Sequence, residues 1–355
     1  MVTRVTRRVF LAGLSGSAVS YGQRTRKPRE IPRVGEFVRY LDPVTENSLV
    51  RLTSLSSANR LPAPQNAFVS AKNRFLVFSS DRTGSPSPHL VDLRSGTIRQ
   101  LAESTALNTE SLTLDQSERS LFFIDGKNLR QAQIATRRAT TVAEGVSAFS
   151  GRSEADLLFV REGQLQRAGN GEILAANVSA GSCLLSPDGA FCLFNRTSGS
   201  DSELWCVPVR AAGSARRLAA GPIRFPYWSP DSQSVLFLRD VPGNGIVLSE
   251  IHRVSINGNT EERVTGTSQF ASFSPNSDAS VFVGASRSKA QPTIDLLLEA
   301  SRRELTLCEH HATKADAVTP VFAPDSRRVY FQSDREGKPA IYSINVELLV
   351  EPTFS

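Results

Sequence analysis

The sequence predicts an all-β protein, a seven-bladed β-propeller whose ring is closed by an N-terminal hairpin. Three observations predict it: a turn-and-strand unit recurs seven times, the copies are spaced as four-stranded blades require, and an extra hairpin precedes the first copy. The chain has 355 residues, which is enough for one large propeller with a sizeable core.

The repeating unit has the form Ser-Pro-Asp-x-x-x-apolar-x-Phe. Its clear copies are SPDGAFCLF (186–194), SPDSQSVLF (229–237), SPNSDASVF (274–282) and APDSRRVYF (323–331), and its weaker copies are SAKNRFLVF (70–78), LDQSERSLF (114–122) and GRSEADLLF (151–159). Proline presets the backbone φ, and aspartate hydrogen-bonds the backbone two residues on, so each unit opens with a tight turn. The alternating apolar residues that follow predict an inner strand packed between neighbouring blades.

Each unit ends on a phenylalanine. These anchors are Phe78, Phe122, Phe159, Phe194, Phe237, Phe282 and Phe331. They lie 44, 37, 35, 43, 45 and 49 residues apart, the length of a four-stranded blade. The outer half of a blade is clearest in HLVDLRSGTIRQL (89–101), a hairpin that turns at Ser95 and Gly96. A similar hairpin, RYLDPVTENSLVRLT (39–53), precedes the first unit, and we expect it to complete the last blade so that no sheet edge stays open.

Several acidic residues recur at equivalent places in different blades. Asp188, Asp231 and Asp325 occupy the turns, and the pairs Asp81-Arg82 and Asp334-Arg335 follow the Phe-bearing strands. Catalytic carboxylates would not repeat from blade to blade. We therefore expect turn formation for the first three, and ion pairs or surface turns for the other two.

The N-terminus resembles an export signal. Arg7 and Arg8 precede Val9-Phe10-Leu11 and a short apolar stretch of small residues, as in twin-arginine signals, and cleavage after Ser20 is expected. We predict a signal peptide at 1–20, a basic linker at 21–36 and the propeller at 37–355. The expected location is periplasmic or secreted, with no membrane span after signal removal.

The net charge of +6 falls to +3 without the signal, and much of the rest lies in the linker. This distribution gives no reason to expect a nucleic-acid partner. The four cysteines show no metal-finger spacing. Cys183 and Cys192 flank a predicted turn, so they are either a disulfide or, as we expect, free buried thiols.

In propellers, the loops that lead into the inner strands converge on one mouth of the channel, where ligands bind. The candidate substrate-binding residues there are Arg60, Asn108, Arg224, Gln269, His310 and His311. Arginine suits carboxylate ligands. His89 falls within the outer half of the first blade and His252 on a strand of the fifth, and both are expected to be structural or surface groups. The chain has no zinc-protease, serine-hydrolase or phosphate-loop motif, so the catalytic residues stay unknown.

Both ends of the propeller region resemble oligogalacturonate lyases: RYLDPVTENSLVRLT, FLVFSSDRTG and HLVDLRSGTIRQL at the start, and FAPDSRRVYFQSDREGKPAIY in the last blade. The repeat is also similar to that of TolB-like propellers (PD40, WD40-like). The lyase resemblance implies β-elimination of pectic oligosaccharides with a divalent metal such as manganese, held mainly by histidines.

The same resemblance places this family's functional groups at positions where this chain has other residues. Histidines of the family fall at Phe225, Gln269, Ala317 and Thr319, and an arginine falls at Glu203 beside Trp205. The chain holds only four histidines, too few to rebuild such a cluster elsewhere. We therefore expect no metal cofactor.

Three hypotheses follow. The first is an exported propeller without the family's metal chemistry that binds a carbohydrate or other small ligand at the channel mouth. The second is an active polysaccharide lyase with a remodelled site. The third is a TolB-like scaffold that docks an envelope protein.

Overall fold

The computed structural model describes residues 35–198, 201–211, 213–242, 247–257, 260–267 and 269–349. The predicted signal peptide and most of the predicted linker lie outside these ranges. The chain divides into two units, Met1–Pro32 and Arg33–Ser355, and all described residues belong to the second.

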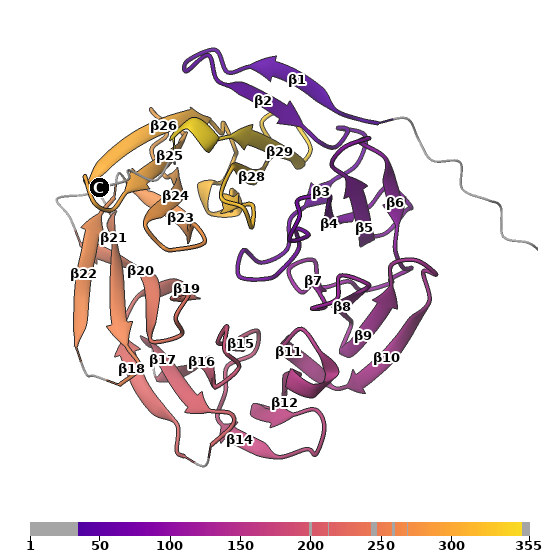
Figure 1. The fold of residues 1–355 in the computed structure, drawn as a ribbon, viewed down its shortest axis with the longest axis vertical. Helices are drawn as coiled ribbons and strands as arrows, with labels where there is room; N and C mark the ends of the chain where they lie inside the picture. Colours follow the sequence, from indigo (N-terminus) through magenta and orange to yellow (C-terminus); the bar gives the residue numbers. More distant parts are fainter. Residues whose placement is uncertain are drawn as a thin grey trace, which may run out of the picture. The chain divides into compact units, whose positions relative to one another are not determined.

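The described residues form seven antiparallel sheets that stand as blades around a ring, which confirms the predicted propeller (Figure 1). The first blade contains β3 (Asn59–Arg60), β4 (Phe75–Ser80), β5 (Ser87–Asp92) and β6 (Ile98–Gln100). The second contains β7 (Thr113–Leu114), β8 (Ser120–Asp125), β9 (Asn128–Gln133) and β10 (Ala139–Glu144). The third contains β11 (Val146–Ser150), β12 (Leu158–Arg161), β13 (Gln164–Arg167) and β14 (Ile173–Ala176).

The remaining blades follow in chain order. The fourth contains β15 (Leu184–Leu185), β16 (Phe191–Ser198), β17 (Asp201–Pro208) and β18 (Arg216–Ala220). The fifth contains β19 (Ile223–Trp228), β20 (Ser234–Pro242), β21 (Val247–Ser255) and β22 (Glu261–Gly266). The sixth contains β23 (Phe270–Pro275), β24 (Val281–Ser286), β25 (Thr293–Leu298) and β26 (Arg303–Glu309). The seventh contains β27 (Val321–Phe322), β28 (Arg328–Ser333) and β29 (Ala340–Asn345).

The N-terminal hairpin closes the ring, as the sequence predicts. Its strands are β1 (Val38–Leu41) and β2 (Ser48–Arg51), and β2 pairs antiparallel with β29 through Leu49↔Ile344 and Arg51↔Tyr342. Leu49 is fully buried in the last blade. Glu36, at the end of the predicted linker, already contacts the first blade, because its carboxylate accepts a hydrogen bond from Arg82 at 3.0 Å.

Three short 3-10 turns complete the described secondary structure, which contains no α-helix. They are η1 (Glu154–Asp156), η2 (Ala315–Ala317) and η3 (Glu347–Leu349). No helix in the described ranges has the length and apolar character of a membrane span.

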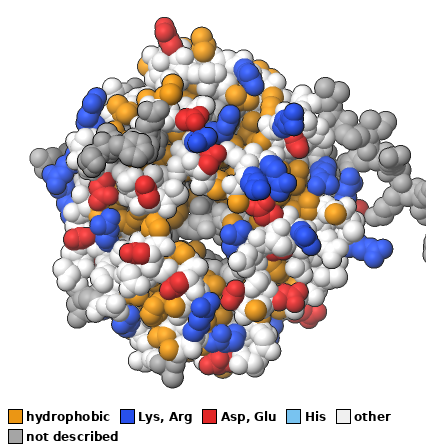
Figure 2. All heavy atoms as spheres, in the orientation of Figure 1, with side chains coloured by type: hydrophobic (Ala, Val, Ile, Leu, Met, Phe, Trp, Pro, Cys, Tyr) orange, Lys and Arg blue, Asp and Glu red, His pale blue; other side chains and the backbone are white. Residues whose placement is uncertain are grey.

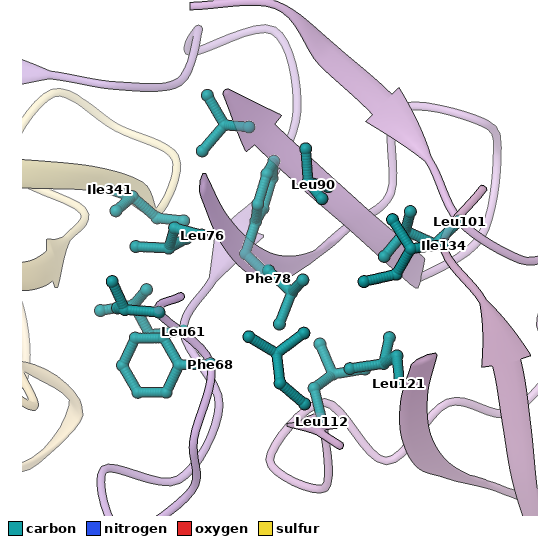
Figure 3. Close-up of a cluster of buried hydrophobic side chains, with 14 of the residues drawn as sticks. Leu61, Phe68, Leu76, Phe78, Leu90, Leu101, Leu112, Leu121, Ile134 and Ile341 are labelled. Atoms are coloured by element: carbon teal, nitrogen blue, oxygen red, sulfur yellow. The ribbon is translucent and has the colours of Figure 1, made fainter. Parts of the chain in front are cut away.

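The anchoring phenylalanines lie on the second strand of each blade, next to the innermost one, in the inner half of the blade. The reason is that the Pro-Asp turn itself joins the innermost strand to the second one. All seven rings are buried, with at most 5% of their surface exposed. They pack with aliphatic side chains of neighbouring blades. Figure 3 shows such a cluster around Phe78, formed by Leu61, Phe68, Leu76, Leu90, Leu101, Leu112, Leu121, Ile134 and Ile341.

The turn aspartates have the expected structural role. In the fourth blade, the Asp188 carboxylate accepts hydrogen bonds from the Ala190 N–H at 2.9 Å and the Ser186 hydroxyl at 2.6 Å. Asp231 and Asp325 likewise accept from backbone N–H groups two residues on. Of the Asp-Arg pairs, Asp81 accepts from the Ala58 N–H and Asp334 from the Thr313 N–H, so both stabilise neighbouring turns.

Two repeats have a different register from the predicted one. In the second, the Asp115 N–H donates to the Ser120 carbonyl at 3.0 Å, so Phe123 and not Phe122 matches Phe194 of the fourth blade. The other is the sixth repeat. Its turn is formed by residues 276–279, two residues later than the Ser-Pro-Asn pattern suggests, with the Asn276 N–H donating to the Val281 carbonyl at 2.8 Å. The matching bond in the fourth blade joins Ser186 and Phe191. Gly284 therefore occupies the place that Phe194 holds in the fourth blade.

The four cysteines are free thiols, as expected. The sulfur atoms of Cys183 and Cys192 lie 3.6 Å apart, and Cys192 is fully buried. Of the histidines expected to be structural, His89 is buried on β5, and His252 on β21 stacks on the Phe237 ring at 5.9 Å.

Candidate functional site

Two arginines from different blades converge near the channel mouth. Arg224 lies at the start of β19, and its Nη2 donates to the Asp240 carboxylate at 2.5 Å. Arg287, just after β24, donates to both oxygens of the same carboxylate at 3.4 Å. We call Arg224 and Arg287 the arginine pair. Asp240 therefore holds two guanidinium groups beside one another, each with about a quarter of its side chain exposed.

Local backbone irregularities position this pair. The β19–β20 register shifts between Arg224 and Tyr227, and Phe225 has a φ of +49°, so a bulge in the strand re-aims the Arg224 side chain. The Arg224 Nη1 also donates to the carbonyl of Ala271 in the next blade. Gln269 has a φ of +59°, and its carbonyl accepts from the Arg287 N–H at 2.8 Å. Gln269 thus fixes Arg287 through its backbone.

The charge of Asp240 is stabilised by its partners. Burial alone would raise the pKa of this carboxyl. The hydrogen bond and charge of Arg224, the Ser249 hydroxyl and the charge of Arg287 outweigh burial and lower the pKa below its usual value. Asp240 is consequently a carboxylate at neutral pH, and it compensates one of the two guanidinium charges.

A second carboxylate lies on the outer side of the arginine pair. Asp316, in η2, has an oxygen 3.5 Å from Arg224 Nη1 and 3.7 Å from Arg287 Nη2. Its side chain is 71% exposed. A carboxylate group therefore fits between the two guanidiniums from the solvent side.

A pocket of about 300 Å³ lies beside the η2 segment. Arg60, Thr313, Lys314, Ala317, Gln332 and Asp334 are among its lining residues. The Gln332 amide donates to the Ala317 carbonyl at 2.6 Å and accepts from the Leu61 N–H at 2.8 Å. These bonds tie the η2 segment to the first blade, and Arg60 and Lys314 line the pocket together with Asp334.

Asn108 lies in a different pocket, of about 230 Å³, that Ser182, Cys183 and Pro226 also line. Its side-chain oxygen accepts from the Glu110 N–H at 3.1 Å. The structure thus separates Asn108 from Arg60 and the arginine pair.

The two adjacent histidines have different environments. His310 is buried, and both ring nitrogens have partners: Nε2 lies 3.0 Å from the Ser286 carbonyl, and Nδ1 accepts from the Ala312 N–H at 3.0 Å. Burial lowers the pKa of His310, so the ring is neutral at neutral pH. His311 is exposed and pairs with Glu309 at 2.7 Å. Neither histidine joins the arginine pair.

The residues present do not fit a histidine-held metal. Ala317 and Thr319 offer no imidazole, the His310 nitrogens are occupied, and Phe225 lies against the Arg224 guanidinium. Glu203, where the resemblance expects an arginine, accepts from the Trp205 indole at 2.9 Å and from Arg217 at 2.8 Å. In the described part of the chain, no three His, Cys, Asp or Glu side chains cluster as metal ligands.

A segment of the first blade occupies the middle of the channel. After β3 the chain leaves the blade and reaches toward the centre of the ring (Figure 1). The Gln65 amide lies 3.4 Å from the carbonyl of Pro226 in the fifth blade, and the Asn66 amide donates to the Glu110 carbonyl at 2.8 Å. Beyond this segment lies a pocket of about 590 Å³ at the Pro-Asp turns, lined partly by Arg152, Arg210 and Trp228.

The sequence did not predict that Asp240 and Arg287 belong to the site, or that Asp316 pairs with the two arginines. A departure from the repeat was the available signal: Ser80-Asp81-Arg82 and Ser333-Asp334-Arg335 follow their strands, whereas Arg287 follows Ser286 directly. Compared with the first and seventh blades, the sixth blade therefore carries an arginine without a preceding aspartate. On the face drawn in Figure 2, acidic and basic side chains are interspersed, with no broad patch of one sign.

The fold is shared with oligogalacturonate lyases of known structure. The lyase of Vibrio parahaemolyticus superposes with a TM-score of 0.73 at 18% identity, covering 88% of this chain and 97% of that one. An oligogalacturonate lyase in complex with manganese gives a TM-score of 0.73 at 18% identity, covering 87% of this chain and 96% of the other. TolB from Acinetobacter baumannii, at 16% identity over 76% of this chain and 62% of its own, has a TM-score of only 0.46.

No protein-family model matches the sequence, and no curated protein matches it. At 18% identity, the likeness to the lyases shows a common seven-bladed propeller fold and nothing finer.

Proposed function

We propose that this propeller binds a carboxylate-bearing carbohydrate, or a small organic acid of similar size, at the arginine pair, and that it does so without metal-dependent β-elimination. One observation carries the proposal: two guanidiniums from neighbouring blades are fixed by Asp240 so that a carboxylate fits between them from the solvent side. Arginine recognises carboxylates through paired N–H donors, which gives both affinity and orientation.

The neighbouring groups support a sugar acid over a simple anion. The pocket beside η2 has room for several heavy atoms, and Arg60, Lys314, Thr313 and Gln332 around it offer hydrogen-bond donors. In an oligosaccharide, a unit next to the one whose carboxylate contacts the arginine pair would occupy this pocket. The lack of suitable metal ligands at Ala317, Thr319 and Phe225 supports binding without lyase chemistry.

Calorimetric titration with a galacturonate trisaccharide and with the matching neutral galactose trisaccharide tests the proposal. We expect binding of the acid alone, and a loss of at least about tenfold in Arg224→Gln and Arg287→Gln, since charged hydrogen bonds contribute about 1.5–3 kcal/mol. Arg94→Gln removes the same charge from an exposed turn of the first blade and should bind as the wild type does. Equal binding of both sugars, or no effect of the two substitutions, would contradict the proposal.

The same samples test the absence of β-elimination. We expect no ultraviolet absorbance of an unsaturated uronate product, with or without added Mn²⁺. Product formation would instead support the hypothesis of a remodelled lyase.

We also propose export through the twin-arginine route, supported by Arg7, Arg8 and the apolar residues that follow. Replacing both arginines with lysine should leave the protein in the cytoplasmic fraction, whereas unchanged fractionation would contradict this route.

A further inference from the structure

Asp316 is a counter-ion of the arginine pair that belongs to the protein itself. We propose that the carboxylate of the ligand displaces the Asp316 side chain from the arginine pair, so that Asp316 sets the affinity of the site and selects acidic ligands over neutral ones. This inference rests on the proposed function, because it concerns the same arginine pair.

The two carboxylates at the pair are held very differently. Asp240 accepts hydrogen bonds from Arg224 at 2.5 Å and from Ser249 at 3.0 Å, with only 24% of its side chain exposed. Asp316 has 71% exposure and contacts of 3.5 and 3.7 Å, beyond good hydrogen-bond distance. Within the described residues, its carboxylate has no other hydrogen bond. Asp240 is thus a permanent part of the site, and Asp316 is an exchangeable one.

The backbone around Asp316 stays in place when its side chain leaves. The Ala317 N–H donates to the Lys314 carbonyl at 3.1 Å, and the Val318 N–H donates to the Ala315 carbonyl at 2.9 Å. Val318 is fully buried, and Gln332 holds the Ala317 carbonyl. Rotation of the Asp316 side chain about its own bonds is therefore sufficient to clear the arginine pair, and no loop movement is required.

Displacement changes the charge that a ligand meets. With Asp316 in place, two guanidiniums and two carboxylates are formally neutral. When Asp316 leaves, one positive charge is uncompensated, and a ligand carboxylate restores neutrality. A neutral sugar would lose the Asp316 contacts and gain no charge interaction in return. Exposed ion pairs are individually weak, so we expect the two contacts together to lower the affinity for an acid by about three- to tenfold.

The decisive variant is Asp316→Asn, which keeps the shape and removes the charge of an exposed residue. Calorimetry with the galacturonate trisaccharide should show affinity about three- to tenfold tighter than for the wild type. Glu110→Gln removes a like charge from another exposed loop that leads into an innermost strand, and it should leave the affinity unchanged. The neutral galactose trisaccharide should gain measurable binding only in Asp316→Asn, where there is no carboxylate to displace.

The outcomes separate this inference from the proposed function. Unchanged or weaker affinity in Asp316→Asn, with binding still lost in Arg224→Gln, overturns the role of Asp316 and leaves the binding site standing. An equal gain in Glu110→Gln also overturns it, because the effect would then be one of overall charge. If neither the wild type nor Asp316→Asn binds the acid, both the site and the inference are wrong.

Discussion

The ring of Phe270 lies where a side chain on Gly284 would stand. A Cβ atom at position 284 would come 2.2 Å from Phe270 Cδ2, far inside van der Waals contact. Phe270 itself is fully buried at the start of β23, and Gly284 lies on β24. In the sixth blade, Gly284 occupies the place of the anchoring phenylalanine, and the aromatic ring that fills the space comes from Phe270 on the innermost strand.

Gly284→Ala should consequently destabilise the protein. The new methyl group has no room unless the buried ring moves, and such overpacking costs about 3 kcal/mol. Urea denaturation would measure the loss. Gly169→Ala is the matched control, since nothing lies within 4 Å of a Cβ there and its φ is ordinary. Equal stability of the two variants would show that Phe270 repacks easily.

The repeat predicted the blades because the Pro-Asp turn and the buried phenylalanine have direct structural causes. It failed in the sixth blade for a physical reason: the Ser-Pro-Asn sequence imitates the turn signal, while Asn276 and Asp278 two residues later form the actual turn. Phe282 is buried like the other anchors, so apolar pattern alone does not distinguish the two registers.

The candidate site was less predictable from the sequence than the blades were. Arg224 and Gln269 were identified because they lead into innermost strands, a property of the sequence order. The partner Asp240 lies on β20 and Arg287 follows β24, and only the ring brings them together. Such contacts between blades have no local signal apart from the arginine that follows Ser286 directly, where the first and seventh blades have an aspartate.

Because the N-terminal hairpin closes the ring, we expect a substitution at Leu49 to destabilise the protein strongly. This side chain is fully buried against the last blade, so Leu49→Ala should cost about 2–5 kcal/mol of unfolding free energy. Leu41 lies on the partner strand β1 with 64% exposure, and Leu41→Ala should change stability by less than about 0.5 kcal/mol. Similar, small losses in both variants would indicate that the hairpin contributes little to the closed ring.

His89 predicts a pH dependence of stability. Burial lowers its pKa to about 4, with Arg82 acting in the same direction, while the hydrogen bond to the Ser87 carbonyl and the Glu36 charge oppose the shift. The unfolded chain takes up this proton near pH 6.5. The contribution of the neutral, buried His89 ring to folding stability is therefore complete above that pH and is lost as the pH falls toward about 4. The shift corresponds to about 3 kcal/mol.

Thermal denaturation between pH 7 and pH 4 would check this expectation. The wild type should lose stability through this interval more steeply than His89→Gln, which has no imidazole to protonate. Parallel curves for the two proteins would contradict the assigned shift. Carboxylates such as Glu36, whose pKa is lowered by the Ser54 and Arg82 contacts despite burial, lose their contribution at the acid end in both proteins.

The thiols predict a simple reactivity pattern. Cys192, Cys206 and Cys308 are fully buried, and burial raises the pKa of Cys206 to about 12, so these sulfurs are neither accessible nor ionised. Cys183 is partly exposed and lines the pocket near Asn108. A thiol reagent should therefore modify one of the four cysteines in the native protein and all four after denaturation. Cys183→Ser should remove the native reaction. Only two reactive thiols after denaturation would instead reveal a bond between Cys183 and Cys192.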